Sequence, residues 1–437
     1  MNATSVSKKG LRTLARSSAA EGFVLELICS VALFVLFQLI YVEVEYPIFS
    51  YVGYELHVDL AEIAFGWLLY IAAFLGIYSA KDSMSGIFLY VYFYLSIAPC
   101  IVMYMYAHTQ LWMLAYQLLF LLFIRVCVLI LDTCFARRVV LSERRMDIAS
   151  SKLLWFAVLA FFAFMLLQNG IPNINDILFE NVSEVRANYD ASLVIVLLQN
   201  LMCKILIPLM ISSAFEKKKW GLFALAFAVQ VYIYAVTGFK TFLLIPVLII
   251  GTKFLRTKNF KRLIVWGLPV AMSAALVLFL IIRNNMFAAI VFNRLVFLPA
   301  KIKECYFDFF SQNEFVYFTQ SSIASIFGIE SNYSTEVVYL IGEKYFNSPD
   351  MWTNCGFLSD AYANWGVPGG FLMSLLLAVE LHLLDNAVHI PSKNYATAIF
   401  LIFFIGLNDG GLISVSISGG FLLAILLIYF TRAGEYE

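Results

Sequence analysis

Long apolar stretches dominate the chain, and they constrain its fold more than any other feature of the sequence. A helix needs about 20 mostly apolar residues to cross a bilayer, and the sequence contains about twelve such stretches. Only 13% of the 437 residues are charged, whereas soluble domains carry about 25%. We therefore expect an all-α, polytopic membrane helix bundle that forms one integral domain over residues 1–437. The expected spans are residues 22–42, 60–80, 84–106, 111–131, 153–167, 193–215, 220–236, 242–255, 263–282, 368–384, 395–407 and 412–430.

The distribution of Lys and Arg predicts how these spans are oriented. If the N-terminus is cytoplasmic, 20 of the 29 Lys and Arg residues fall in segments on that side, seven on the other side and two within spans. Because cytoplasmic loops of membrane proteins are rich in Lys and Arg, we expect both termini in the cytoplasm. The formal net charge is zero, so no nucleic-acid partner is indicated.

One outer segment, residues 283–355, is far longer than an ordinary connection, and long loops in compact proteins are usually functional or disordered. Its aromatic residues, among them Phe307, Phe309 and Phe310, provide enough apolar surface to pack on the bundle or lie at the membrane interface. We expect a large, ordered periplasmic loop. Residues 356–367, which precede the next span, are expected to form a short re-entrant helix.

Four cations lie in outer segments, where the orientation rule disfavours them: Arg186, Lys240, Arg283 and Arg294. Arg294 follows Arg283 by eleven residues, so a continuous helix places both guanidinium groups on one face. Converging cations form a strong anion site, because the planar guanidinium matches phosphate oxygens and stays charged. The alternative is that each cation pairs with a lipid headgroup or a loop carboxylate.

A second cluster of polar residues lies in the stretch from Asn354 to Gly370. Asp360 and Asn364 are four residues apart and therefore share a helical face, and Trp365 follows them. A carboxylate, a carboxamide and an indole suit the hydroxyls and apolar face of a sugar. A structural hinge is an equally good interpretation, because the glycines and the proline from Gly366 onward break a helix.

The long loop contains several acids with the chemistry of a general base, and their spacing does not choose among them. It contains no histidine. The acids include Glu304, Asp308, Glu314, Glu330, Glu336 and Glu343.

The seven cysteines include no C-x-x-C pair and have no histidine at ligand spacing, so neither a metal site nor any other cofactor is expected. Cys305 and Cys355 share the outer loop and are either bridged or free.

Several of these segments together resemble the bacterial O-antigen and oligosaccharide repeat-unit polymerases. The resemblance rests on the sequence Thr-Gly-Phe-Lys-Thr at 237–241, on residues 294–299 leading to Tyr-Phe-Asp-Phe-Phe at 306–310, and on residues 354–369. It covers about half of the chain, and the number of spans and the layout of charge agree with it elsewhere. It implies a GT-C-like glycosyltransferase architecture with a helical outer loop, in the inner membrane of a bacterium.

The resemblance implies that the chain joins oligosaccharide repeat units, carried on undecaprenyl pyrophosphate, into O-antigen, capsule or exopolysaccharide. Cations that stabilise the leaving pyrophosphate lower the barrier to this transfer without a metal. A chain-length regulator and a flippase are implied as protein partners. The resemblance implies pyrophosphate binding by Arg186, Arg283, Arg294 and Lys240, and sugar binding by Asp360, Asn364, Trp365 and Tyr189.

Two alternatives remain open at this stage. O-antigen ligases share this architecture and chemistry, but likeness to them implies a histidine base in the large loop, which this loop lacks. A lipid-linked oligosaccharide flippase belongs to a different class, in which internal repeats and polar sites near the membrane midplane are common. The polar residues here gather in outer segments instead, which favours the polymerase.

Overall fold

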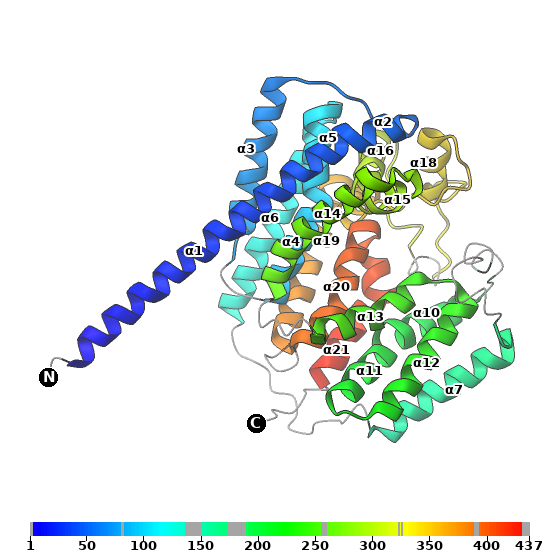
Figure 1. Ribbon diagram of the computed structural model, residues 1–437. Coiled ribbons are helices and arrows are strands. Elements are labelled where there is room, and N and C mark those ends of the chain that lie inside the picture. The colour runs from blue at the N-terminus through cyan, green and yellow to red at the C-terminus, as the bar shows by residue number, and fades with distance from the viewer. Residues whose placement is uncertain are drawn as a thin grey trace. The chain divides into compact units, whose positions relative to one another are not determined.

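The computed structural model describes residues 3–79, 83–135, 150–172, 185, 189, 191–254, 260–321, 324, 327–388 and 393–430. All regular secondary structure among these residues is helical, as the apolar stretches predict (Figure 1). The chain divides into two compact units. Unit 1 comprises Met1–Val126, Asn259–Tyr317 and Ser331–Leu375, and unit 2 comprises Cys127–Lys258, Phe318–Glu330 and Leu376–Glu437.

Unit 1 contains most of the N-terminal helices and the segment that follows Arg283. Several of its helices contain π-helical turns, which often occur at functional sites. Its elements are α1 (Ala3–Ile40), η1 (Tyr41–Glu45), α2 (Tyr46–Phe49), η2 (Ser50–Val52), α3 (Leu60–Ile77), α4 (Met84–Tyr92), η3 (Phe93–Ile97), α5 (Ala98–Ala107), most of α6 (Leu111–Cys134), α14 (Phe260–Ile282), α15 (Asn285–Ala288), η6 (Ala289–Phe297), α16 (Leu298–Gln312), α18 (Val337–Phe346) and the first part of α19 (Phe357–Ala387).

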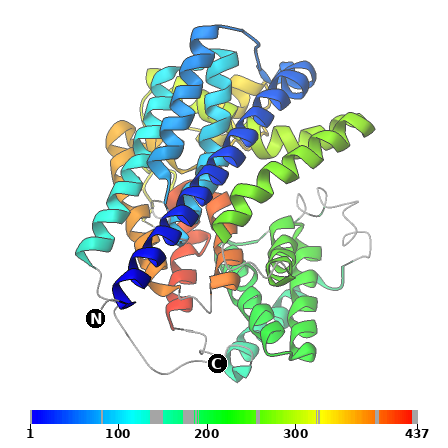
Figure 2. The same cartoon turned by 60° about the vertical axis from the view of Figure 1, so that its left-hand side comes forward.

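Helices α1 and α14 lie side by side in unit 1 and run in the same direction, with α14 beginning partway along α1 (Figures 1 and 2). A buried ion pair joins them where α14 begins: Nζ of Lys261 lies 2.8 Å from Oε2 of Glu26, and the side chains are 3% and 4% exposed. Lys261 also donates to the carbonyl oxygen of Ser79 at 2.7 Å. These contacts satisfy the ammonium group inside the bundle, where an unpaired charge is costly.

The segment from Asn285 to Gln312 starts and finishes at the opposite end of unit 1, where α1 and α14 end. Near its start, the rings of Phe292 and Phe279 meet edge to face at 6.1 Å. Near its finish, Asp308 contacts Gln110, which lies between α5 and α6. Length and composition would let this segment cross a membrane, but its contacts return it to the end at which it began.

Unit 2 contains the remaining helices. Within it, Nδ1 of His382 in α19 lies 2.7 Å from Oδ1 of Asp132 at the end of α6, and Ser416 donates to Glu380 at 2.9 Å. Its complete elements are α7 (Lys152–Asn169), α10 (Leu193–Asn200), η5 (Leu201–Leu206), α11 (Ile207–Glu216), α12 (Trp220–Thr237), α13 (Lys240–Phe254), α20 (Lys393–Asp409), η8 (Ser414–Ser418) and α21 (Phe421–Phe430).

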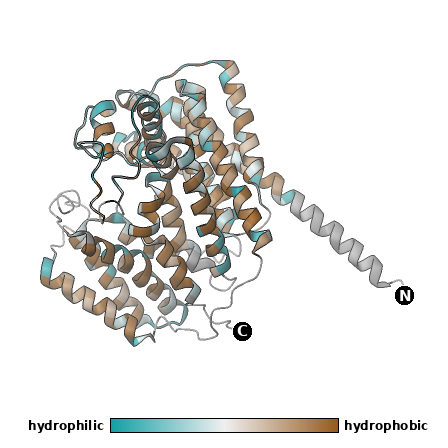
Figure 3. Ribbon diagram, turned by 180° about the vertical axis from the view of Figure 1, so that it is seen from behind, coloured by the Kyte–Doolittle hydropathy of each residue, from teal (hydrophilic) through white to brown (hydrophobic). Residues whose placement is uncertain are grey.

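Ten helices of the described residues are long and apolar enough to cross a membrane, as in a multi-pass membrane protein. Most of their residues are hydrophobic, and the hydrophilic residues gather in connections and at helix ends (Figure 3). The count of twelve is not confirmed. Two apolar helices, at Lys240–Gly251 and Thr397–Asp409, are shorter, and a left-handed Gly420 interrupts the last expected span before α21. The ten are Glu21–Val52, Leu60–Ile77, Met84–Ala107, Leu111–Cys134, Lys152–Asn169, Val194–Glu216, Trp220–Thr237, Phe260–Ile282, Asn285–Gln312 and Phe357–Ala387.

Candidate functional site

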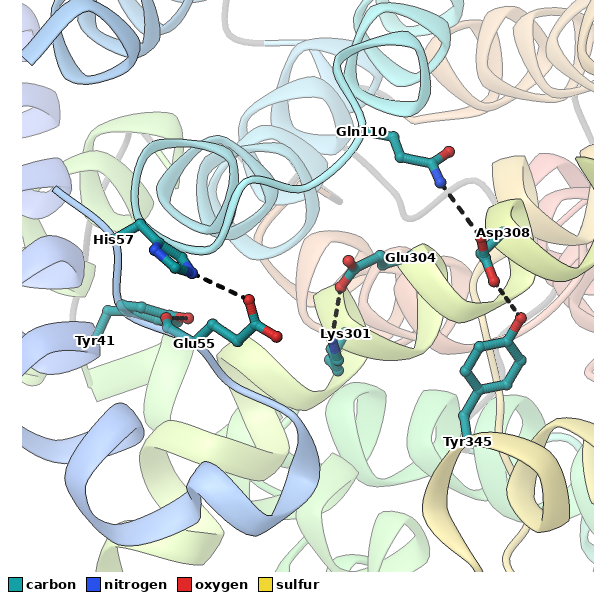
Figure 4. Close-up of polar contacts among 8 residues, drawn as sticks. All are labelled: Tyr41, Glu55, His57, Gln110, Lys301, Glu304, Asp308 and Tyr345. Atoms are coloured by element: carbon teal, nitrogen blue, oxygen red, sulfur yellow. Dashed lines mark hydrogen bonds and ion pairs between the residues drawn. The ribbon is translucent and has the colours of Figure 1, made fainter. Parts of the chain in front are cut away.

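Polar side chains from four parts of the sequence gather where α1 and α14 end in unit 1 (Figure 4). They come from α16, from α18 and from the two short connections at residues 53–59 and 108–110. Backbone contacts fix these connections. The N–H of His57 donates to the carbonyl oxygen of Tyr106 at 2.7 Å, and the hydroxyl of Tyr41 donates to the carbonyl oxygen of Glu55 at 2.7 Å. The site is therefore assembled by the fold and not by one local motif.

Helix α16 presents a polar stripe to this end. Lys301, Glu304 and Asp308 lie three and four residues apart and so share one helical face, where they are half-buried. Another face anchors the helix: Lys303 is fully buried and donates to Oγ of Ser96 at 2.8 Å. Of the two alternatives that the sequence left open for the aromatic residues, those of α16 pack on the bundle, because Phe307, Phe309 and Phe310 are buried.

Asp308 is held by neutral hydrogen-bond donors from two other parts of the chain (Figure 4). The Tyr345 hydroxyl donates to Oδ2 at 2.5 Å, and Nε2 of Gln110 donates to Oδ1 at 3.3 Å. Burial and the hydrogen bond to Asp308 raise the pKa of Tyr345, so the phenol keeps its proton and remains the donor. Each carboxylate oxygen retains lone pairs for a further contact, since a carboxylate offers about four acceptor sites.

Trp112 is connected to this carboxylate through Gln110. Its indole N–H donates to Oε1 of Gln110, the residue whose amide donates to Asp308. The indole packs against Phe307 at 5.1 Å and Tyr362 at 5.3 Å between ring centroids. Trp112 is nevertheless 39% exposed, so part of a rigidly held aromatic surface adjoins an oriented carboxylate.

Glu304 is held differently, by a charged partner. Nζ of Lys301 lies 2.9 Å from Oε2 of Glu304, and the two side chains are 17% and 21% exposed. Lys301 also lies against the backbone of Gly53, where a Cβ atom would meet Cε of the lysine at 3.3 Å. This contact brings the 53–59 connection onto α16, while the ion pair neutralises the charge of Glu304.

Two histidines occupy the same end of unit 1, although neither belongs to the long loop. The rings of His57 and His108 lie 4.7 Å apart, and each contacts a carboxylate, Glu55 for His57 and Glu62 for His108. Nothing in the sequence associates these histidines with α16. The connection through Gly53 to Lys301 does so in the structure.

Arg283 ends α14 in a left-handed conformation, with φ of 53°, which is uncommon for a residue other than glycine. Its guanidinium lies 5.9 Å from the ring centroid of Phe279, and the residue is exposed. Asn284 then caps α15 by accepting a hydrogen bond from the N–H of Phe287 at 3.0 Å. The expected continuous helix from Arg283 to Arg294 is therefore wrong, because the chain turns between them.

Arg294 lies exposed on the π-helical η6, and its neighbour Asn293 is buried. Asn293 donates to Oε2 of Glu45 at 2.8 Å and to the hydroxyl of Tyr54 at 3.2 Å, which fixes one side of η6. Neither Arg283 nor Arg294 forms an ion pair with a carboxylate of the described residues. Both charges are therefore available to an anion.

Asp360, Asn364 and Trp365 lie at the start of α19, before a kink at Trp365 and Gly366. The amide of Asn364 donates to Oδ1 of Asp360 at 3.2 Å and to its carbonyl oxygen at 2.8 Å, so the expected shared face is confirmed. Asn364 is only 8% exposed, whereas Trp365 is 47% exposed. Their roles in sugar binding remain predictions.

The kink in α19 is stabilised by the chain that follows α16. Carbonyl groups at a helix end lack intrahelical partners. Here the N–H of Val316 donates to the carbonyl oxygen of Ala363 and the N–H of Tyr317 to the carbonyl oxygen of Asn364, both at 2.9 Å. Gly366 has a φ of 58° and lies so close to Phe315 that a Cβ atom would meet its ring at 2.9 Å. A side chain at position 366 would therefore be disfavoured both by the left-handed backbone and by collision with the Phe315 ring, so the helix break expected here requires glycine.

The remaining predicted site residues belong to unit 2 or fall outside the described part of the chain. The ring of Tyr189 meets that of Phe239 at 6.4 Å, next to the exposed Lys240 that begins α13. Arg186 lies outside the described residues. The predicted convergence of all four cations remains a prediction.

Cys305 and Cys355, which the sequence allowed to be either bridged or free, are both free and buried. Burial raises the pKa of the Cys355 thiol well above its usual value, which does not suit a nucleophile. Within the described ranges, no group of three or more His, Cys, Asp and Glu side chains is arranged to hold a metal ion.

Sequence reasoning missed Gln110, Trp112 and Tyr345 as parts of this site. Gln110 is 198 residues from Asp308, and Tyr345 is 37 residues from it, so no local pattern associates them. Only their position could have suggested a role in the site, since all three lie in or beside segments predicted to be outside the membrane. Comparison of the chain with protein-family models, with curated proteins and with solved structures gave no significant match.

Proposed function

We propose that the protein is a membrane glycosyltransferase that joins undecaprenyl-pyrophosphate-linked oligosaccharide repeat units, with a GT-C-like architecture. One observation carries the proposal: the segment after α14 returns to the end of unit 1 where it began, and that end combines exposed arginines with an oriented carboxylate. Arg283 and Arg294 make no ion pair with described carboxylates, and Asp308 is held by neutral donors.

These two kinds of group suit the two partners of a glycosyl transfer. An acceptor hydroxyl attacks the anomeric carbon of the donor sugar, while the bond from that carbon to the pyrophosphate oxygen breaks. Negative charge develops on the pyrophosphate, and guanidinium groups stabilise it in bidentate fashion. The acceptor hydroxyl loses its proton, which requires a nearby base. The charge layout of the sequence supports the periplasmic side for this reaction.

The experiment that tests this function is deletion of the gene in its host, followed by gel analysis of surface polysaccharide and of extracted lipid-linked intermediates. Loss of a polymerase leaves lipid core that carries a single repeat unit. Loss of a flippase leaves bare core with single units retained on the cytoplasmic face. Unchanged polymer in the deletion strain would reject the proposal. For a capsule or exopolysaccharide, the extracted intermediates provide the same distinction.

O-antigen ligase is the second candidate, and one observation favours it. The long loop contains no histidine, but His57 lies on the connection that contacts α16 through Gly53 and Lys301, and its ring approaches that of His108. A histidine is therefore present at the same end of unit 1. Deletion of a ligase leaves bare core and accumulated lipid-linked polymer, which differs from the polymerase outcome.

A further inference from the structure

Asp308 differs from the other acids of the long segment in how it is held. Among the described acids of this segment, Glu304 is paired with Lys301, and Glu314, Glu330, Glu336, Glu343 and Asp350 are exposed. Asp308 is half-buried and accepts hydrogen bonds from Tyr345 and Gln110, which carry no charge. It is the acid of this set whose orientation is fixed while its negative charge remains uncompensated by an ion pair.

We propose that Asp308 is the base that accepts the proton of the acceptor sugar hydroxyl, that Tyr345 and Gln110 position it, and that Trp112 binds the face of that sugar. This inference rests on the proposed glycosyl transfer. The acceptor is the terminal sugar of a lipid-linked oligosaccharide, and the contacts define where its reacting hydroxyl lies: beside a carboxylate and an exposed indole.

The geometry supports each role separately. A base must reach the hydroxyl directly, and donors on both oxygens of Asp308 fix the direction of the remaining lone pairs. The indole of Trp112 is oriented by Gln110 and packed on Phe307 and Tyr362, so little side-chain entropy is lost when a sugar stacks on it. One residue, Gln110, thus contacts both the base and the aromatic surface.

The reaction balances without another reactant. The acceptor oxygen forms its bond to the anomeric carbon, and its proton passes to a carboxylate oxygen of Asp308. The electron pair of the breaking bond leaves with undecaprenyl pyrophosphate, and Asp308 later releases the proton to water. A single displacement of this kind inverts the anomeric configuration, which nuclear magnetic resonance of donor and polymer determines. Retained configuration would overturn the assignment.

The decisive experiment measures release of undecaprenyl pyrophosphate by purified full-length protein in vesicles with the lipid-linked repeat unit of the host. Asp308→Ala should lower kcat by about 100-fold or more and leave the KM for the lipid-linked substrate within about twofold, the scatter expected where no contact is lost. Added formate should restore part of the rate, because a small carboxylate can occupy the vacated position. A purely structural role for Asp308 predicts no rescue.

Matched variants separate the roles. Tyr345→Phe removes one hydrogen bond and should lower kcat about fivefold to tenfold with unchanged KM, while Trp112→Ala should chiefly raise KM for the substrate. Glu343→Gln, an exposed change two residues from Tyr345, is the control and should retain wild-type kinetics. If Asp308→Ala is nearly as active as wild type, or if it is impaired and formate fails to restore activity, the base is elsewhere.

Failure of this inference is distinguishable from failure of the proposed function. If wild-type protein releases undecaprenyl pyrophosphate and Asp308→Ala does so equally well, the transfer stands and the assignment of the base is wrong. If wild-type protein releases none and the deletion strain makes normal polymer, the proposed function itself is rejected. Should Asp308→Ala fail to accumulate, Asp308→Asn replaces it, because the amide keeps the shape of the side chain.

Discussion

Unit 1 contains two well-defined polar arrangements that are held in opposite ways. Lys261 and Glu26 are almost completely buried and neutralise one another at 2.8 Å, and Ser79 satisfies a further donor of the lysine. Asp308 is half-buried, and its carboxylate accepts hydrogen bonds from the neutral donors Tyr345 and Gln110. The first arrangement is closed and fixes two helices to each other, whereas the second retains charge and acceptor capacity for a substrate.

The difference separates structural polar groups from functional ones. A buried pair adds little net stability, since desolvation offsets its attraction, yet removing one partner leaves an unpaired charge inside the bundle. A carboxylate at the end of the bundle avoids most of that desolvation and remains reactive. The comparison therefore predicts stability defects at one place and activity defects with normal folding at the other.

The largest effect is expected from breaking the closed pair. Lys261→Ala leaves Glu26 buried without its cation and should lower the free energy of unfolding by about 3–5 kcal/mol. Denaturation of the purified protein in mixed micelles measures this value. The double variant Glu26→Gln with Lys261→Met removes both charges and should recover most of the loss. A single variant as stable as wild type would show that the pair does not fix α1 to α14.

Next in size is the effect of removing an exposed arginine. Arg283→Ala and Arg294→Ala should each lower transfer about 100-fold to 1000-fold, as expected when one donor to a developing anion is lost. Protein levels in the membrane should stay normal, because both side chains are exposed. Lysine at either position should rescue only in part, since bidentate geometry is lost. Normal polymer ladders in both alanine variants would eliminate the leaving-group role.

Arg283 needs one further control because its backbone is left-handed. Glycine adopts this conformation without strain, so Arg283→Gly removes the guanidinium and preserves the turn between α14 and α15. We expect it to be as inactive as Arg283→Ala. Activity in the glycine variant alone would show that the turn matters and the charge does not.

The sequence predicted the helical class and most spans because apolar composition alone dictates helices within a bilayer. It also identified the kink near Gly366 and the shared face of Asp360 and Asn364, which depend on local residue types and helical spacing. These features require no knowledge of the tertiary fold. The positive φ of Arg283 was not predictable in this way, because arginine carries no turn signal, and the expected continuous helix was wrong for that reason.

The site around Asp308 lay beyond sequence reasoning for a different reason. The acids of the long segment looked equivalent in the sequence, because the property that separates them is the set of donors around each one. Gln110 approaches Asp308 from 198 residues away, and Gly53 meets Lys301 across a similarly long separation. Such contacts follow from how α16 folds back on the bundle, which a pattern of residue types does not encode.

The smallest effect is expected at Glu304, which lies one turn before Asp308 on the same face of α16. Its partner Lys301 is a cation, and the two side chains are partly exposed, so the pair contributes about 1 kcal/mol or less to stability. Glu304→Gln should leave kcat within about threefold of wild type, since such a difference corresponds to less than 1 kcal/mol in the barrier. Kinetics in vesicles, measured beside Asp308→Asn, check this. If Glu304→Gln abolishes transfer and Asp308→Asn does not, the distinction between a neutralised carboxylate and an available one fails, because the paired acid would then be the one that reacts.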